Sequence, residues 1–209
     1  MNGSLKRLAC GMLILAGWSG LADTNTWIGT GTAATNLFWS DVTNWNPAGP
    51  IAGNDLIVNT NGTYVDESVT GRTLTVTMPA YGIWNVYQTN DAALTLTGTV
   101  YAIRVNMGTL SWLHLYMPIP LTASASLYGN SYLGGIGFHQ TVTSANPLTL
   151  TGAANNYFAL FGDAVFDVPR VNLNTARIRI DNGQSAGMSA PVYCSGSTFL
   201  GFFYQSASL

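Results

Sequence analysis

The fold is indicated most directly by a short stretch that occurs twice, as Ala93-Leu-Thr-Leu-Thr-Gly98 and as Pro147-Leu-Thr-Leu-Thr-Gly152. Thr73-Leu-Thr-Val-Thr77 is a looser copy upstream of the first. Apolar residues alternating with threonine are typical of a strand with one buried face. The offset of 54 between the two close copies fits three coils of about 18 or two of about 27, and the offset of 20 from the looser copy fits one coil. These lengths predict a solenoid, in which each coil adds strands to continuous parallel sheets.

The rest of the chain reads as short strands separated by turn residues, with no convincing amphipathic helix after the N-terminal region. The class is therefore all-β. The predicted strands are Leu56–Val58, Thr73–Met78, Ile83–Tyr87, Leu94–Thr97, Ile103–Val105, Leu110–Tyr116, Ile136–Thr143, Leu148–Leu150, Tyr157–Phe161, Val165–Val168, Ala176–Ile180 and Thr198–Phe203.

In a solenoid, inward-facing Leu, Val and Ile would stack on their equivalents one coil away, and outward-facing Thr would meet solvent. Asn and Gly would form the corners, because both tolerate positive φ. The alternative architecture is an antiparallel β-sandwich, whose strands alternate clearly and are joined by tight hairpins. Some segments, including Leu94–Thr97, also fit that description.

Charge is scarce: only 8% of the 209 residues are charged, against about 25% in typical soluble domains. A stacked architecture explains this, because like residues about 4.8 Å apart repel one another if they are Lys or Glu but not if they are Thr or Asn. The chain has no basic patch that could neutralise phosphates, so nucleic acid is not an expected partner.

The N-terminus resembles a secretory signal peptide, which we assign to residues 1–22. Lys6 and Arg7 form a charged start, Leu8–Trp18 forms a short apolar run, and the sequence up to Ala22 suits a signal peptidase. The apolar run is too short to span a bilayer, so no membrane span is expected in the mature chain. Cys10 lies within this segment and leaves Cys194 alone, which we expect to be a small buried residue.

A tryptophan-rich segment follows, which we assign to residues 23–58 as a cap ahead of a solenoid body at residues 59–209. We expect its three indoles to close the first coil, with their N–H groups donating to loop carbonyls. Asp41 and Asn44 would stabilise the loop through side-chain-to-backbone bonds, and Gly53 and Asp55 would shape the turn into Leu56–Val58. The cap residues are Trp27, Gly29, Trp39, Asp41, Asn44, Trp45, Gly53 and Asp55.

This head, with its Trp-x-Gly, Asn-Trp and Gly-x-Asp elements, resembles the head of large exported bacterial proteins that carry autotransporter-associated β-strand repeats. The Leu-Thr-Leu-Thr-Gly segments are similar to the repeats that follow such heads. The resemblance implies a right-handed parallel β-helix and a secreted or outer-membrane-associated surface passenger with a structural or adhesive role. Members of that group are usually longer and end in a membrane barrel or a sorting segment, so we expect this chain to be a fragment, truncated at its C-terminus, or a short relative.

Two other functions are open. A carbohydrate-binding module would expose Trp39, Trp45 or Trp84 as stacking platforms for sugars of a polysaccharide, whereas Trp112, in an apolar run, is expected in the core. A β-helical polysaccharide lyase or hydrolase would need clustered carboxylates, for which the available acids are Asp66, Glu67, Asp91, Asp163, Asp167 and Asp181. Neither His114 nor His139 has a motif, and no metal ligand set, cofactor fingerprint or catalytic motif is present. The leading expectation is a non-catalytic exported surface protein.

Overall fold

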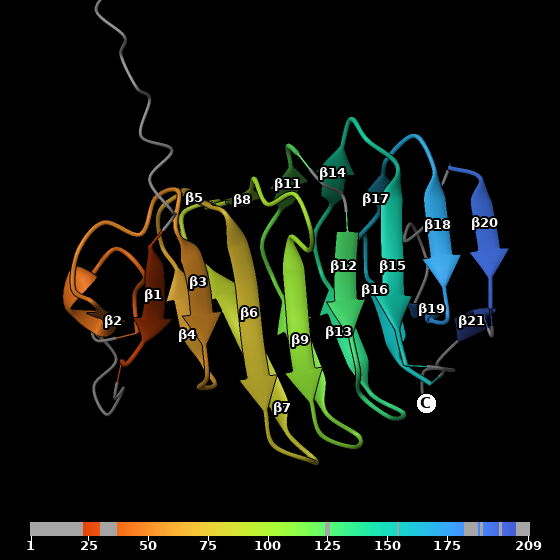
Figure 1. Cartoon of the computed structure of the whole chain (residues 1–209), viewed down its shortest axis with the longest axis horizontal. Coiled ribbons are helices and arrows are strands. Elements are labelled where there is room, and N and C mark those ends of the chain that lie inside the picture. Colours follow the sequence, from red (N-terminus) through yellow and green to blue (C-terminus); the bar gives the residue numbers. More distant parts are fainter. Residues whose placement is uncertain are drawn as a thin grey trace, which may run out of the picture.

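Parallel strands wind into a three-sided solenoid in the computed structural model, which describes residues 23–29, 37–123, 126–153, 155–181, 188, 190–196 and 198–203. The chain turns in a right-handed sense, and its long axis runs across the strands (Figure 1). The prediction of an all-β parallel solenoid is confirmed, and the sandwich alternative is wrong. The segment predicted as a signal peptide, residues 1–22, lies outside the described residues.

Three sheets, which we name A, B and C, form the three sides, and from β3 to β18 the chain visits them in that order in each coil. Sheet A consists of β2 (Trp45–Asn46), β1 (Thr24–Trp27), β3 (Asp55–Val58), β6 (Thr73–Met78), β9 (Ile103–Met107), β12 (Ser126–Gly129), β15 (Leu148–Gly152), β18 (Val171–Asn174) and β20 (Val192–Ser195). Sheet B consists of β4 (Thr63–Val65), β7 (Ile83–Gln88), β10 (Trp112–Leu115), β13 (Gly135–Phe138), β16 (Tyr157–Phe161), β19 (Arg177–Asp181) and β21 (Phe199–Phe203). Sheet C consists of β5 (Val69–Gly71), β8 (Leu94–Leu96), β11 (Ile119–Leu121), β14 (Val142–Ser144) and β17 (Phe166–Asp167).

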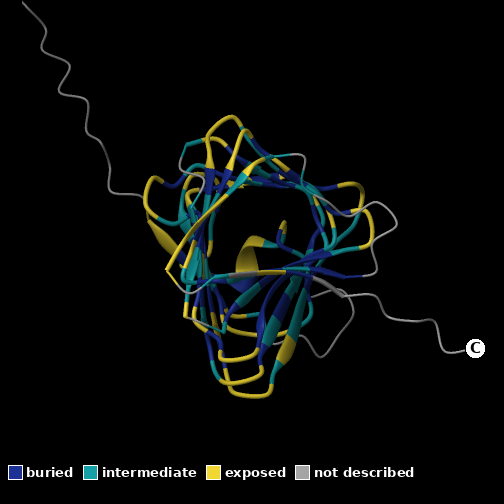
Figure 2. Ribbon diagram, turned by 90° about the vertical axis from the view of Figure 1, so that its right-hand side faces the viewer, coloured by how far each residue is buried: buried dark blue, intermediate teal, exposed yellow. Residues whose placement is uncertain are grey.

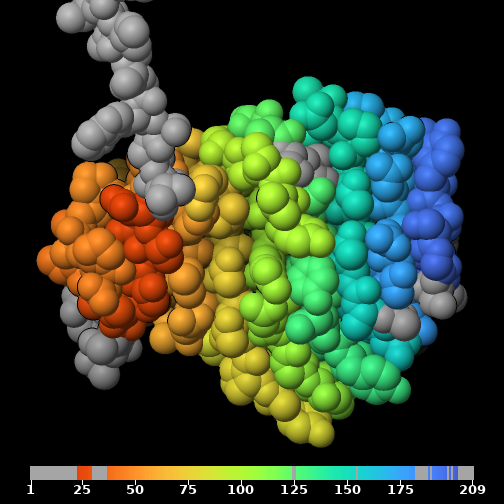
Figure 3. Space-filling view, in the orientation of Figure 1, coloured from red at the N-terminus to blue at the C-terminus, as the bar shows by residue number. Residues whose placement is uncertain are grey.

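Strands pair in register with the equivalent strand one coil away, so like residues form columns along the axis. In sheet A the inward column passes through Leu56, Leu74, Ile103, Leu127, Leu150 and Leu173. All six are fully buried, which confirms that aliphatic residues stack on their equivalents. Figure 2, which looks along the axis, shows buried and intermediate residues along the walls and exposed ones mostly at the corners. Figure 3 shows the coils as successive bands of colour along the long axis.

The two Leu-Thr-Leu-Thr copies do not occupy equivalent places, contrary to the spacing argument. Leu94–Leu96 is β8 in sheet C, whereas Leu148–Gly152 is β15 in sheet A. Coils are also unequal: Asp55 pairs with Thr73, whereas Thr75 pairs with Arg104, so the second of these coils is more than half as long again as the first. A strand with alternating Leu and Thr fits any of the three sides, because each side has one buried and one outer face.

Several corners between sheets A and B depart from the expected Asn and Gly, although Gly62, between β3 and β4, fits the expectation with a φ of 76°. Tyr81, Leu110 and Leu133 have φ values of 60°, 58° and 58°, which bulky residues rarely adopt. These corners stack on one another through backbone bonds, including one from Tyr81 N to Thr109 O and one from Leu110 N to Tyr132 O.

Buried polar side chains hold this corner from inside. Ser111 Oγ donates to Pro79 O at 2.5 Å, and Ser131 Oγ donates to Gly108 O at 2.9 Å. Ser131 N in turn donates to Asn156 Oδ1 at 3.1 Å. Ser111, Ser131 and Asn156 are fully buried, so their bonds to backbone groups compensate for desolvation and secure the unusual backbone of the turns.

Candidate functional site

The tryptophan cap closes the first coil as predicted. β1 pairs in parallel with β3, and β2 pairs in antiparallel fashion with β1, covering the edge of sheet A. Trp45 makes edge-to-face contacts with Trp27 and Trp39, with ring centroids 5.1 and 5.3 Å apart. The loop before β2 contains a short 3-10 helix, η1 (Val42–Asn44).

Hydrogen bonds within the cap agree with most of the expectations. Asp41 Oδ1 accepts a bond from Thr43 N at 3.0 Å, and the pKa of the Asp41 carboxyl is lowered by the bond from the Thr43 hydroxyl together with this one. Asn44 Nδ2 donates to Phe38 O at 3.1 Å, and Trp45 Nε1 donates to Trp39 O at 3.1 Å. The expectation that every indole N–H has a carbonyl partner is wrong for Trp27 and Trp39, whose buried nitrogens have none among the described residues.

Gly53 and Asp55 lie at the turn into β3, as expected, and Gly29 leaves room for the Trp27 ring. A side chain at Gly29 would overlap the Trp27 ring, since a Cβ there would lie 2.6 Å from it. Gly53 has a φ of +79° in the turn before β3, and its N–H donates to Thr70 O. Asp55 at the start of β3 is bonded to Arg72 and Thr73, and the Arg72 guanidinium holds the pKa of Asp55 below its usual value.

Burial of the cap tryptophans excludes sugar stacking at two of the three proposed positions, Trp39 and Trp45. Trp39 and Trp45 are each only 1% exposed, so in this structure neither offers a ring face to a ligand. Trp84 is half-buried and packs against the core, on the inward side of β7 in register with Leu113. The hypothesis of a sugar-stacking platform at Trp39, Trp45 or Trp84 is therefore wrong for Trp39 and Trp45, because both rings are buried inside the cap.

Aromatic side chains gather instead on the outer face of sheet B, in a column with one ring from each coil. Tyr64, Tyr87, Tyr116, His139 and Phe161 stack in turn, with neighbouring ring centroids 5.2, 5.1, 3.9 and 4.8 Å apart. All five side chains are half-buried. Since the rings cover one another's faces, the column presents their edges and the tyrosine hydroxyls outward.

A second group lies beside this column. Trp112 is half-buried on the outer face, so its expected place in the core is wrong; the inward positions of β10 belong to Leu113 and Leu115. Its ring is nearly parallel to that of Tyr157 at 6.1 Å, and the Arg179 guanidinium lies 5.9 Å from its centre. Arg177 Nη1 donates to the Tyr157 hydroxyl at 3.1 Å. We call this set the sheet B face: Tyr64, Tyr87, Trp112, His114, Tyr116, His139, Tyr157, Phe161, Arg177 and Arg179.

Two histidines that the sequence left without a role meet on this face. His114 Nδ1 and His139 Nε2 lie 2.9 Å apart, so one imidazole donates to the other. Gly137 makes room for them, because a Cβ there would lie 2.8 Å from His114 Nδ1 and from Phe161 Cε2. Burial lowers the pKa of His114, and burial together with the His114 ring lowers the pKa of His139 to about 4. The pair is therefore neutral at pH 7.

We expect the folded chain to lose stability in mild acid because of this pair. The unfolded chain takes up protons first as the pH falls below about 6.5, so stability is full above that value and falls until about pH 4, the folded pKa of His139. Discounted for solvent screening of a half-exposed ring, the loss is about 1–2 kcal/mol. Urea denaturation at pH 7.5 and pH 4.5 measures it. His139→Phe, which keeps a stacked ring, should remove most of the difference; an unchanged difference would contradict the assignment.

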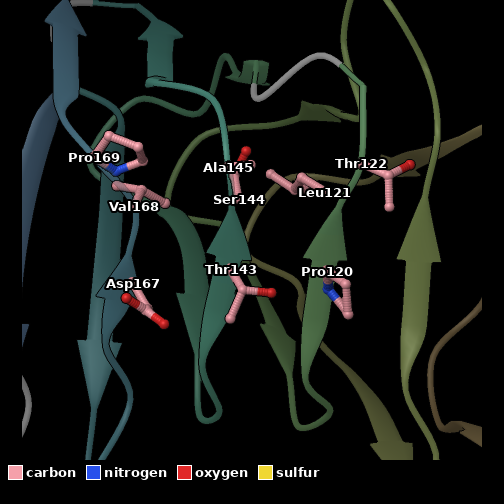
Figure 4. A pocket seen from close by; sticks show the side chains of 9 residues that line it. All are labelled: Pro120, Leu121, Thr122, Thr143, Ser144, Ala145, Asp167, Val168 and Pro169. Carbon is pink, nitrogen blue, oxygen red and sulfur yellow. The ribbon is translucent and has the colours of Figure 1, made fainter.

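The acids proposed for an enzyme are spread over different structural positions. Asp167 lies in a shallow groove of about 650 Å³ across β11, β14 and β17 on the outer face of sheet C. Figure 4 shows Pro120, Thr143 and Asp167 side by side across three strands, which agrees with their register. Asp167 is the only carboxylate among the residues that line the groove, and Asp163 lies in the exposed turn before β17. Glycoside hydrolysis requires two carboxylates at one site, and Asp163 does not line the groove beside Asp167.

The remaining candidates have structural partners or solvent around them. The Asp66 carboxylate accepts bonds from Ser40 N and Oγ, and Asp181 pairs with Arg179 at 2.5 Å. Cys194 is exposed, contrary to the expectation of burial, although it is in register with buried Leu173, because β20 is the last described strand of sheet A. In the described ranges, no three His, Cys, Asp or Glu side chains gather as metal ligands. The same ranges contain no helix with the length and hydrophobicity to cross a bilayer.

No family model matches this chain, and neither a curated protein nor a solved structure is significantly similar to it.

Proposed function

We propose that the chain is a non-catalytic, exported surface protein with an adhesive role, and that the sheet B face is its contact surface. The observation that carries the proposal is the composition of this face. Tyr87 stacks on Tyr116 in the next coil, and Trp112 stacks on Tyr157 two coils away, so these rings are held half-exposed, with Arg177 and Arg179 beside them. Tyr, Trp and Arg are enriched at protein interfaces and at their energetic centres, whereas Lys and Glu are depleted there.

The architecture favours adhesion by many weak contacts. The column from Tyr64 to Phe161 places one ring at each step of the axis, so a partner with its own repeats can engage several coils at once. The rings need little ordering on binding, because stacking already fixes them. The partner class that fits is a component of a cell surface, either protein or polysaccharide.

Export is the part of the proposal that rests on the sequence. A charged start, a short apolar run and small residues before Ala22 form the pattern that the secretion machinery reads. The resemblance of the tryptophan-rich head to autotransporter-type passengers supports the same location.

Two measurements test the proposal. The exported protein should begin at Asp23, as determined by mass spectrometry, and deletion of residues 2–22 should retain it in the cell. The purified protein should bind to intact cells, and the double variant Trp112→Ala/Tyr157→Ala should lower that binding at least about tenfold. Tyr193→Ala removes a tyrosine from the outer face of sheet A and is the matched control. Equal binding by the double variant and the control would contradict the assigned surface.

A further inference from the structure

The outer face of sheet A, turned toward the viewer in Figure 3, carries a pocket of about 280 Å³. Outward side chains of three neighbouring strands form its floor, namely Asp55 of β3, Thr73 and Thr75 of β6, and Arg104 of β9. The corner from β8 to β9 forms its wall, through residues 98–101.

This wall exists because the corner is long. Residues 97–102 connect β8 to β9, whereas Arg72 alone connects β5 to β6 and three residues connect β17 to β18. The corner is also pressed onto the preceding coil at Gly98, where a Cβ would lie 2.7 Å from Arg72 O and 2.8 Å from Thr73 Cγ2. The extra chain length therefore folds over β6 and encloses a space on an otherwise flat sheet.

Of the charged side chains that line the pocket, Asp55 and Arg72 pair with each other, whereas Arg104 has no carboxylate partner among the described residues. Arg72 is paired with Asp55, whose Oδ1 accepts bonds from Arg72 Nε at 2.8 Å and Thr73 Oγ1 at 2.6 Å. Arg104 lies over the Tyr128 ring at 5.5 Å, and no carboxylate pairs with it within the described part of the chain. The pocket thus holds one exposed guanidinium available to an anion.

We propose that this pocket binds the carboxylate of an acidic sugar, within the polysaccharide partner class of the proposed function on which this inference rests. A guanidinium binds a carboxylate with two parallel hydrogen bonds, which Arg104 can donate. Thr75 and Tyr101 line the pocket beside it, and hydroxyl and aromatic groups are suited to the hydroxyls and apolar faces of a sugar ring. One available cation matches one carboxylate, and the pocket is of a size for a single ring.

The test is a calorimetric titration of the purified protein with a trisaccharide of galacturonic acid. Two comparison ligands are titrated in the same way: the matching galactose trisaccharide, and inorganic sulfate. We expect the acidic trisaccharide to bind, and Arg104→Ala to weaken its affinity at least about tenfold, as for the loss of a charged hydrogen-bonded pair. Arg170→Ala is the matched control, because Arg170 is also exposed and lies over a tyrosine, Tyr193, at 5.3 Å.

Four results would overturn the proposal. They are no binding of the acidic trisaccharide, equal affinity for the galactose trisaccharide, equal effects of the Arg104 and Arg170 variants, and displacement of the trisaccharide by equimolar sulfate, which would reduce the site to a simple anion site. The two proposals fail separately. Adhesion through the sheet B face without acidic-sugar binding would remove only the pocket, and the reverse would remove only the adhesive role.

Discussion

Gly135→Ala is expected to destabilise the folded chain by about 3 kcal/mol or more, or to prevent folding, because the added methyl group has no space. Gly135 pairs with Tyr157 of the next coil, and a Cβ at this position would lie 2.0 Å from Tyr157 O and 2.7 Å from its carbonyl carbon. The clash is with backbone, which no rotamer change can relieve. Strands β13 and β16 would have to separate, and the hydrogen bonds between them would be lost.

Gly162→Ala is the matched control, measured with Gly135→Ala by urea denaturation followed by circular dichroism. Gly162 has a φ of +59°, and no atom lies within 4 Å of the place that an alanine methyl group would take, so alanine there is strained only by its backbone conformation. That strain costs about 1–2 kcal/mol. Equal losses for the two variants would contradict the close approach of the coils at Gly135.

Trp45→Ala is expected to lower the free energy of unfolding by about 3–5 kcal/mol, the range for removing a large buried aromatic residue. Trp45 is the centre of the cap: it contacts the rings of both Trp27 and Trp39 and donates its indole N–H to Trp39 O. Its removal leaves a cavity above the first coil and loosens β2, which covers the edge of sheet A.

Trp112→Ala is the matched control, because it removes a tryptophan from the outer face. We expect it to lower the free energy of unfolding by less than about 2 kcal/mol, because this ring is half-exposed. Both variants are measured by urea denaturation at pH 7.5. Should Trp45→Ala keep full stability while losing affinity for a polysaccharide, the cap would be a ligand site and the structural assignment would be wrong.

Alternation along single strands allowed the fold class and the core to be predicted. Leu74 and Leu150 are apolar and lie inside, whereas the neighbouring Thr75 and Thr149 lie on the outer face. The same alternation is expected in whichever sheet a strand joins. For the same reason alternation could not tell β8 from β15 or reveal coil lengths. The short strands β1, β4, β5, β11, β12, β18 and β20, of three or four residues, and β2, of two, were not predicted because so few residues show no period. The predicted strand Ile136–Thr143 is two strands, β13 in sheet B and β14 in sheet C.

The candidate site was harder to predict because its parts come together only through register between coils. His114 and His139 are 25 residues apart in a solenoid whose coils vary in length, so no sequence spacing indicates their contact. The outward position of Trp112 was predictable: in Trp112-Leu113-His114-Leu115 the two leucines mark the inner face. The loop of the tryptophan cap was predictable because the roles of Asp41, Asn44 and Gly53 depend on neighbouring residues, whereas the partners of the Trp27 and Trp39 indoles depend on packing and were predicted wrongly.

The pairing of each strand with the next coil has a mechanical consequence for a protein that links two bodies. The bonds between coils point along the long axis, so tension applied to the two ends loads them in series and opens them one after another. A single coil, such as that from Leu150 to Leu173, releases roughly 75 Å of extended chain when it detaches. Under such tension the solenoid lengthens in steps and leaves its remaining coils intact.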